Sequence, residues 1–136
     1  MAEIVFSSDL TGVDWSALKR ALVADDFDNL RSPDQYWRSH ENSHAVVFGR
    51  YQGEFVANGR ILSDGVCNAY LVDIWTATPH RRKGVGREVV NRLLATVPGQ
   101  HVGLFTDEME AFYRTLGFTP QVGGMSKVVG SWLVAD

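Results

Sequence analysis

A basic segment that contains two glycines constrains this chain more than any other feature. Residues 78–87 follow a strand-like apolar run (69–77) and precede an amphipathic helical run (88–97). A loop that leads from a strand into a helix binds anions, because the first N–H groups of the helix are unpaired and its dipole adds positive charge. Gly84 and Gly86 allow a phosphate to approach the backbone closely. The segment therefore predicts an α/β unit that holds a phosphate or pyrophosphate.

Three phosphate-binding motifs compete for this segment. A P-loop would need Gly-Lys followed by Ser or Thr, but Lys83 precedes Gly84 and no hydroxyl residue follows Gly86. A dinucleotide fingerprint would need a third glycine where Val89 stands, and it would come early in the chain. The remaining pattern, Arg81-x-x-Gly84-x-Gly86, resembles the pyrophosphate loop of the GNAT superfamily of N-acetyltransferases, which bind acetyl-CoA.

A second segment supports the same resemblance. Phe112-Tyr113, followed by Gly117-Phe118, is similar to the helix that ends the second half of GNAT domains, and Gly117 suits a helix C-cap. The resemblance covers residues 45–134 well. It implies an α/β (α+β) fold with a mixed central sheet of about six to seven strands, about four flanking helices and a terminal strand pair that contains Trp132.

Hydrophobic periodicity and turn residues predict the same order of elements. Gly59, inside a predicted strand, indicates a bulge or close packing. With 136 residues, we expect a single domain, 1–136. The expected strands are 3–7, 45–51, 54–62, 68–76 and 101–106, and the expected helices are 13–24, 33–42 and 84–97.

Composition excludes several classes of function. The net charge of -3 gives no global support for nucleic-acid binding, so the basic loop favours a local anionic ligand. Cys67 is the single cysteine and rules out an internal disulfide. No apolar run approaches the ~18 residues of a membrane span, and the first residues lack a signal-peptide pattern. We expect a cytoplasmic protein without a metal.

The resemblance implies a set of residues for acetyl-CoA. Residues 74–76 would bind pantetheine and the acetyl oxygen through backbone groups, at a bulge that splays two central parallel strands. Thr106 stands where many relatives carry an Asn that bonds the cofactor, with Asp107 next to it as a helix cap. The expected cofactor-binding residues are Ile74, Trp75, Thr76, Arg81, Arg82, Lys83, Gly84, Val85, Gly86, Arg87 and Thr106.

Two residues are candidates for proton transfer. The resemblance implies that Tyr113 protonates the leaving thiolate, although core packing would also explain a tyrosine there. Asp73 is the candidate base, because strand alternation places it on the face of Trp75 and opposite Ile74. A structural ion pair would explain Asp73 equally well. His80 is a weaker alternative base.

The predicted function is transfer of an acetyl group from acetyl-CoA to a primary amine of a small molecule. A protein lysine or N-terminus as acceptor, and a non-catalytic CoA-binding module, remain alternatives. Relatives build the acceptor pocket from the first two helices, their loop and the terminal strands, and they are often homodimers. The aromatic and Met side chains that this implies, each also explained by core packing, are Trp15, Phe27, Tyr36, Trp37, Tyr70, Trp75 and Met125.

Overall fold

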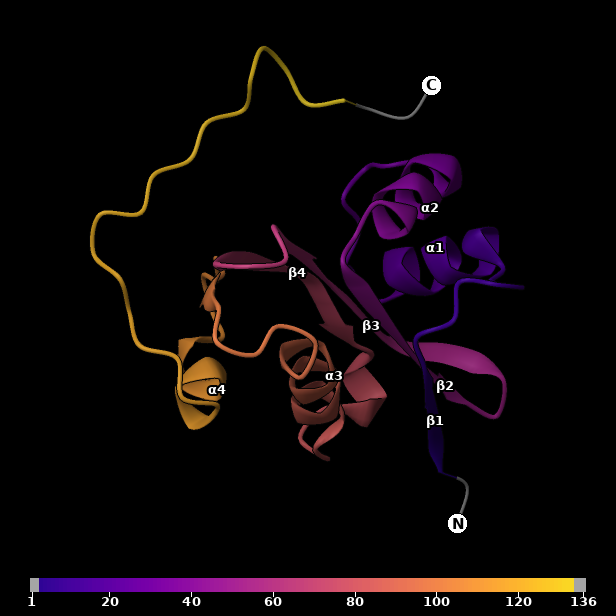
Figure 1. Ribbon diagram of the computed structural model, residues 1–136. Helices are drawn as coiled ribbons and strands as arrows, with labels where there is room; N and C mark the ends of the chain where they lie inside the picture. The colour runs from indigo at the N-terminus through magenta and orange to yellow at the C-terminus, as the bar shows by residue number, and fades with distance from the viewer. Residues whose placement is uncertain (1–2, 134–136) are drawn as a thin grey trace.

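The computed structural model describes residues 3–133 and contains five strands and four α-helices (Figure 1). A short 3-10 helix, η1 (Thr78–His80), precedes α3. The strands are β1 (Ile4–Ser7), β2 (Ala45–Tyr51), β3 (Glu54–Ser63), β4 (Asn68–Thr76) and β5 (His101–Gly103). The helices are α1 (Trp15–Ala24), α2 (Pro33–Glu41), α3 (Val85–Leu94) and α4 (Glu110–Thr115).

One mixed sheet with the strand order β1-β2-β3-β4-β5 forms the centre of the fold. The first four strands pair antiparallel, and β5 pairs parallel to β4 after the crossover through α3. Helices α1 and α2 lie on one side of the sheet, and α3 and α4 lie on the other (Figure 1). Each side has its own apolar cluster: Leu18, Tyr36 and Trp75 on the first, and Val89 and Leu93 on the second.

The first two helices begin at the residues that local chemistry favours. Asp14 caps α1 by accepting a hydrogen bond from the Ala17 N–H. Ser32 and Gln35 form a reciprocal capping box at the start of α2, with Pro33 at its first turn. These caps fix where the α1–α2 loop enters α2, and that loop carries Arg31 toward the sheet.

A bulge interrupts β4, as the resemblance implied. Asn58 pairs with Trp75 and Arg60 with Val72, so Asp73 and Ile74 both lie opposite Gly59. Asp73 has the left-handed backbone angle φ 57°. A Cβ on Gly59 would lie 2.7 Å from Ile74 and 2.8 Å from Val89, so only glycine fits there. The bulge and the close packing that Gly59 predicted are thus both present.

The predicted sheet of six to seven strands is wrong for the described part of the chain. Within residues 3–133, no strand follows β5, and residues 119–133 form an extended segment, here called the C-terminal tail, that runs back toward α2 (Figure 1). Gly123 and Gly130 adopt positive φ in the tail. Glycines weaken strands because they add backbone entropy and no side-chain packing, and an isolated hairpin is marginal. β5 is also shorter than the predicted 101–106.

Candidate active site

The two parallel strands separate after a short paired stretch. β4 and β5 pair only from Asn68–His101 to Tyr70–Gly103, although β4 continues to Thr76. The edge of β4 from Leu71 onward therefore lacks a neighbouring strand on the β5 side, and the bulge lies within this stretch. A splayed pair of this kind can accept an extended ligand whose polar groups bond to the free backbone edge.

The basic loop lies at the end of β4 and leads into α3. Gly84 is the N-cap with φ 83°, a backbone angle that L side chains rarely adopt, and α3 begins at Val85. The first α3 N–H to close a helical bond is that of Glu88, to the Gly84 carbonyl. The N–H groups of Val85, Gly86 and Arg87 consequently point out of the helix end, where an anion is stabilised.

Arg81 is held by the protein itself. Its Nε donates to the Thr76 carbonyl over 2.9 Å, and its terminal nitrogen donates to Asp25 over 3.2 Å. The Thr76 carbonyl, expected to face the ligand, is thus partly occupied by Arg81. In this geometry the role of Arg81 is to fix the loop against the end of α1.

Asp25 is a residue that the sequence left unassigned. Its carboxylate also accepts hydrogen bonds from the indole N–H of buried Trp75 over 2.9 Å and from the Thr78 N–H over 3.1 Å. Burial raises the pKa of Asp25, but the bonds from Thr78 and Trp75 and the charge of Arg81 outweigh it, so the pKa lies below its ordinary value. Asp25 joins the C-terminus of α1, strand β4 and the basic loop. In the sequence, Asp25 is part of a run of acidic residues and carries no motif that would indicate this role.

The other basic side chains of the loop differ in their surroundings. Arg82 and Lys83 are exposed, and Arg82 has φ 62°. Arg87 donates to the Thr115 hydroxyl over 3.2 Å and so links α3 to α4. Gly86 faces the same region, since a Cβ there would lie 3.3 Å from Phe112 and 3.5 Å from the Thr76 hydroxyl. The start of α3, the end of β4 and α4 therefore pack closely together around Gly86.

Tyr113 lies on α4, next to Phe112. Its ring packs edge-on against Phe112 and Phe118, with centroids 4.9 Å and 5.7 Å away. Burial raises the pKa of Tyr113, so the phenol keeps its proton at neutral pH. Packing and an acid role are compatible here, because the ring is half-buried while the hydroxyl is a proton donor.

Asp73 lies on the opposite face of β4 from Ile74, on the side of α2. Its carboxylate accepts a hydrogen bond from Arg60 Nε over 2.7 Å and lies 3.8 Å from the Arg31 guanidinium. Arg60 also donates to the Ser43 hydroxyl over 3.3 Å. The structure therefore places Asp73, the candidate base, in an ion-pair cluster with Arg60 and Arg31. The sequence did not indicate which residues would pair with Asp73.

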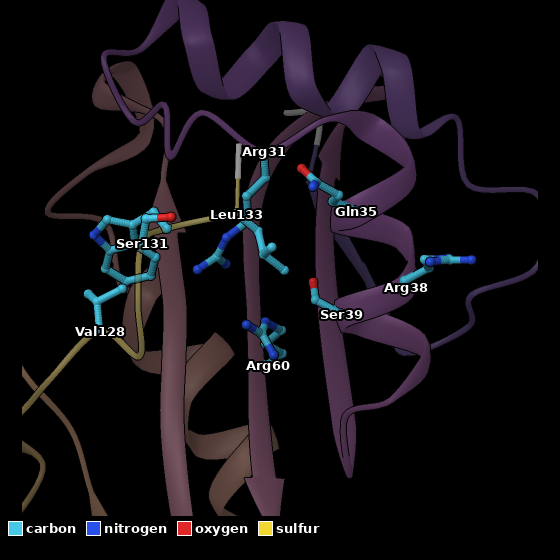
Figure 2. A pocket seen from close by; sticks show the side chains of 9 residues that line it. Arg31, Gln35, Arg38, Ser39, Arg60, Val128, Ser131 and Leu133 are labelled. Atoms are coloured by element: carbon cyan, nitrogen blue, oxygen red, sulfur yellow. The ribbon is translucent and has the colours of Figure 1, made fainter. Parts of the chain in front are cut away.

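A cavity of about 500 Å³ lies next to this cluster, between α2, β3 and the C-terminal tail (Figure 2). It receives Arg31 from the α1–α2 loop and Arg60 from β3, with Trp132 and Leu133 from the tail. The resemblance implied an acceptor pocket near the first two helices and the terminal strands, but the aromatic candidates do not line this cavity. Tyr36 and Trp75 are fully buried in the core beneath α1 and α2, while Trp37, Tyr70 and Met125 are exposed elsewhere.

The remaining candidates have local roles in the structure. The Thr106 hydroxyl accepts a hydrogen bond from the Met109 N–H and so closes the turn before α4, a role expected of Asp107. His80 packs against Tyr51 at 5.0 Å. Among the described residues, no group of three or more His, Cys, Asp or Glu side chains could hold a metal, and no helix is long and apolar enough to cross a membrane.

The fold and the site define an acyltransferase-like architecture, and comparison with known proteins identifies the family. Residues 13–118 match the acetyltransferase (GNAT) family, and the chain belongs to it. A curated relative, serotonin N-acetyltransferase 2, chloroplastic, from Oryza sativa subsp. japonica, is 31% identical over 116 residues. That match covers 79% of this chain and 58% of the rice protein, so the chain spans little more than half of its length.

Solved structures share the same fold. A protein from Xanthomonas campestris pv. campestris assigned to the GNAT family has a TM-score of 0.80 at 25% identity, covering 95% of both chains. Glucosamine-6-phosphate N-acetyltransferase from Arabidopsis thaliana has a TM-score of 0.69 at 15% identity, covering 93% of this chain and 98% of that chain. The second likeness concerns the fold alone.

Proposed function

We propose that this protein is an acetyl-CoA-dependent N-acetyltransferase that acts on a primary amine of a small molecule. The observation that carries the proposal is the splayed end of β4 and β5, with the basic loop at the end of β4 and with α4, which carries Tyr113, packed against the start of α3. Membership of the GNAT family supports the reaction class, as does the small-molecule amine, serotonin, for which the rice relative is named.

The residues of the loop fit a pyrophosphate. The outward N–H groups of Val85, Gly86 and Arg87 would bind its oxygens, and Arg82 and Lys83 would add charge from the exposed side. The free edge of β4, at residues 74–76, would hold the pantetheine arm and the acetyl oxygen through backbone groups. Bound there, acetyl-CoA supplies a thioester carbonyl for attack by the amine.

Proton transfers complete the reaction. The acceptor must lose a proton to attack, since an ordinary alkyl ammonium with a pKa near 10.4 is only about one part in a thousand neutral at pH 7. The thiolate that leaves needs a proton, and Tyr113 is the proposed acid, because its raised pKa keeps the phenol protonated. Thr106 could hold the cofactor through its hydroxyl, which also accepts from Met109.

Asp73 is the proposed base, acting directly or through water. Its pairing with Arg60 and Arg31 supports the alternative role, in which it positions the two arginines rather than taking the amine proton. The two roles differ in pH dependence. If Asp73 is the base, Asp73→Asn changes the shape of the pH–rate profile. If Asp73 only pairs with the two arginines, the same substitution lowers stability and leaves the shape of the profile unchanged.

The decisive experiment measures thiol release from acetyl-CoA with a panel of amines, beside calorimetric titration with acetyl-CoA. Amine-dependent thiol release at a rate above that of the Tyr113→Phe variant supports the proposal. Binding of acetyl-CoA without transfer to any amine would identify a CoA-binding module instead. Acetylation of peptides but of no small amine would overturn the small-molecule assignment.

A further inference from the structure

Within the described residues, the charged side chains that line the cavity between α2, β3 and the C-terminal tail are all positive. Its charged lining consists of Arg31, Arg38 and Arg60, and within the described residues no Asp or Glu lines it. Arg38 lies at the rim, is 71% exposed and pairs with Asp34 over 3.6 Å, so solvent screens its charge. Arg31 and Arg60, by contrast, are largely buried, with 27% and 9% of their side chains exposed.

Among residues 3–133, Asp73 is the carboxylate that pairs with these two buried guanidinium groups. Asp73 accepts from Arg60 over 2.7 Å and lies 3.8 Å from Arg31. Within the described part of the chain, two positive charges against one negative charge leave one positive charge in excess at the cavity wall. An excess positive charge that is partly removed from water has lost part of its hydration. It favours binding of an anion, because the anion replaces the lost interactions with water.

The two arginines differ in how firmly they are held. Arg60 is fixed by two hydrogen bonds, to Asp73 and to the Ser43 hydroxyl. Arg31 donates no hydrogen bond from its guanidinium within residues 3–133, and its charged end lies 6.0 Å from the ring centroid of Trp132. Figure 2 shows Arg31 and Arg60 directed into the same space, while Arg38 points away from it. Arg31 thus directs its guanidinium group into the cavity, and a guanidinium fork matches a carboxylate or phosphate.

We propose that this cavity binds an oxyanion on the acceptor, so that the substrate is a small amine that also carries a carboxylate or a phosphate. This inference rests on the proposed acetyltransferase function and specifies its substrate class. Asp73 lies in the β4 bulge, so an oxyanion at Arg31 would leave the amine end directed toward the splayed strands. Trp132 and Leu133 offer an apolar wall to the body of such a substrate.

The test compares pairs of amines that differ only by the oxyanion. Tryptophan is measured against tryptamine, and phosphoethanolamine against ethanolamine, as kcat/KM for thiol release from acetyl-CoA. We expect the acidic member of at least one pair to be preferred about 10- to 100-fold, the effect of one charge-assisted hydrogen bond. The carboxylate and phosphate arms show which oxyanion the cavity selects.

Arg31→Gln should remove most of this preference, because its rate should fall much more with the acidic member of a pair than with the uncharged partner. Arg20→Gln is the matched control, because Arg20 is an exposed arginine on α1 outside the cavity, and it should keep the preference. Equal use of both members of each pair, or an equal loss for both in Arg31→Gln, would overturn the inference and leave the acetyltransferase function intact.

The two proposals can fail separately. If no amine supports thiol release, the proposed function fails, and calorimetric titration of the same pairs into the protein still tests the cavity. Tighter binding of the acidic member, lost in Arg31→Gln, supports the oxyanion site, and equal affinities refute it. Acetylation confined to peptides with acidic residues would refute the small-molecule class.

Discussion

Asp25 offers the sharpest test of how the basic loop is held in place. Asp25→Ala removes the acceptor of the Trp75 indole N–H, which is buried and would lose its partner at a cost of about 1–3 kcal/mol. The bonds to Thr78 and to half-exposed Arg81 add only about 1 kcal/mol together, because water replaces them. The expected loss in the free energy of unfolding is therefore about 2–4 kcal/mol.

That loss corresponds to a fall in Tm of about 7–14 °C for a chain of this length, measured by calorimetry. Asp25→Asn keeps an oxygen acceptor and should lose less than half as much. Asp107→Ala, a substitution of an exposed aspartate outside this network, is the control and should leave Tm almost unchanged. Asp25→Ala should also weaken acetyl-CoA binding, because Arg81 and Thr78 lose their anchor.

The pH dependence gives a second measurement on the same variant. Since the folded pKa of Asp25 is lowered, its contribution is present above the unfolded pKa near 3.9 and is lost as pH falls through the folded value. The difference in Tm between wild type and Asp25→Ala should therefore shrink below about pH 4. A Tm for Asp25→Ala equal to that of Asp107→Ala at pH 7 would refute the anchoring role.

Three further substitutions and one control, Gly99→Leu, test the remaining roles. Gly84 and Gly99 have similar positive φ, and a side chain at either position would enter open space. Gly84→Leu and Gly99→Leu should therefore each lower stability by about 1–2 kcal/mol through backbone strain alone. Only Gly84→Leu should weaken acetyl-CoA binding in calorimetry, and equal binding by both would remove the loop from the site. Tyr113→Phe should keep binding and slow turnover by about 10²- to 10⁴-fold, and an unchanged rate would assign the proton to solvent. Asp73→Asn should lower the rate most at neutral pH and recover at high pH if Asp73 is the base, whereas a pH–rate profile parallel to wild type would exclude that role.

Local sequence determined the elements of this fold and the place of its loop. The periodic apolar residues and turn glycines predicted β1 to β4 and the first three helices within a few residues, because those signals act between near neighbours. Gly59 predicted its bulge for the same reason, since only a residue without Cβ fits opposite Ile74. Two short motifs were enough to indicate the GNAT family, which the match over residues 13–118 confirms.

The C-terminal tail shows where that reasoning failed. A terminal strand pair was expected from resemblance, yet residues 119–133 form no strand. Their glycines give weak local signals, and pairing at the end of a sheet depends on a free neighbouring edge. Resemblance supplied the expectation of strands there, and the local sequence carried little to support it.

Sequence alone predicted which residues bind a phosphate, because that signal lies within a single segment, 81–87, and the family resemblance added the candidate for proton transfer, Tyr113. The tertiary structure decided which distant charges meet. It brought Asp25 to Arg81 across 56 positions, and it placed Arg31 and Arg60 beside Asp73 at the wall of one cavity. Ion pairs between such distant residues produce no local pattern in the sequence, because each charged side chain by itself is typical of solvated surface.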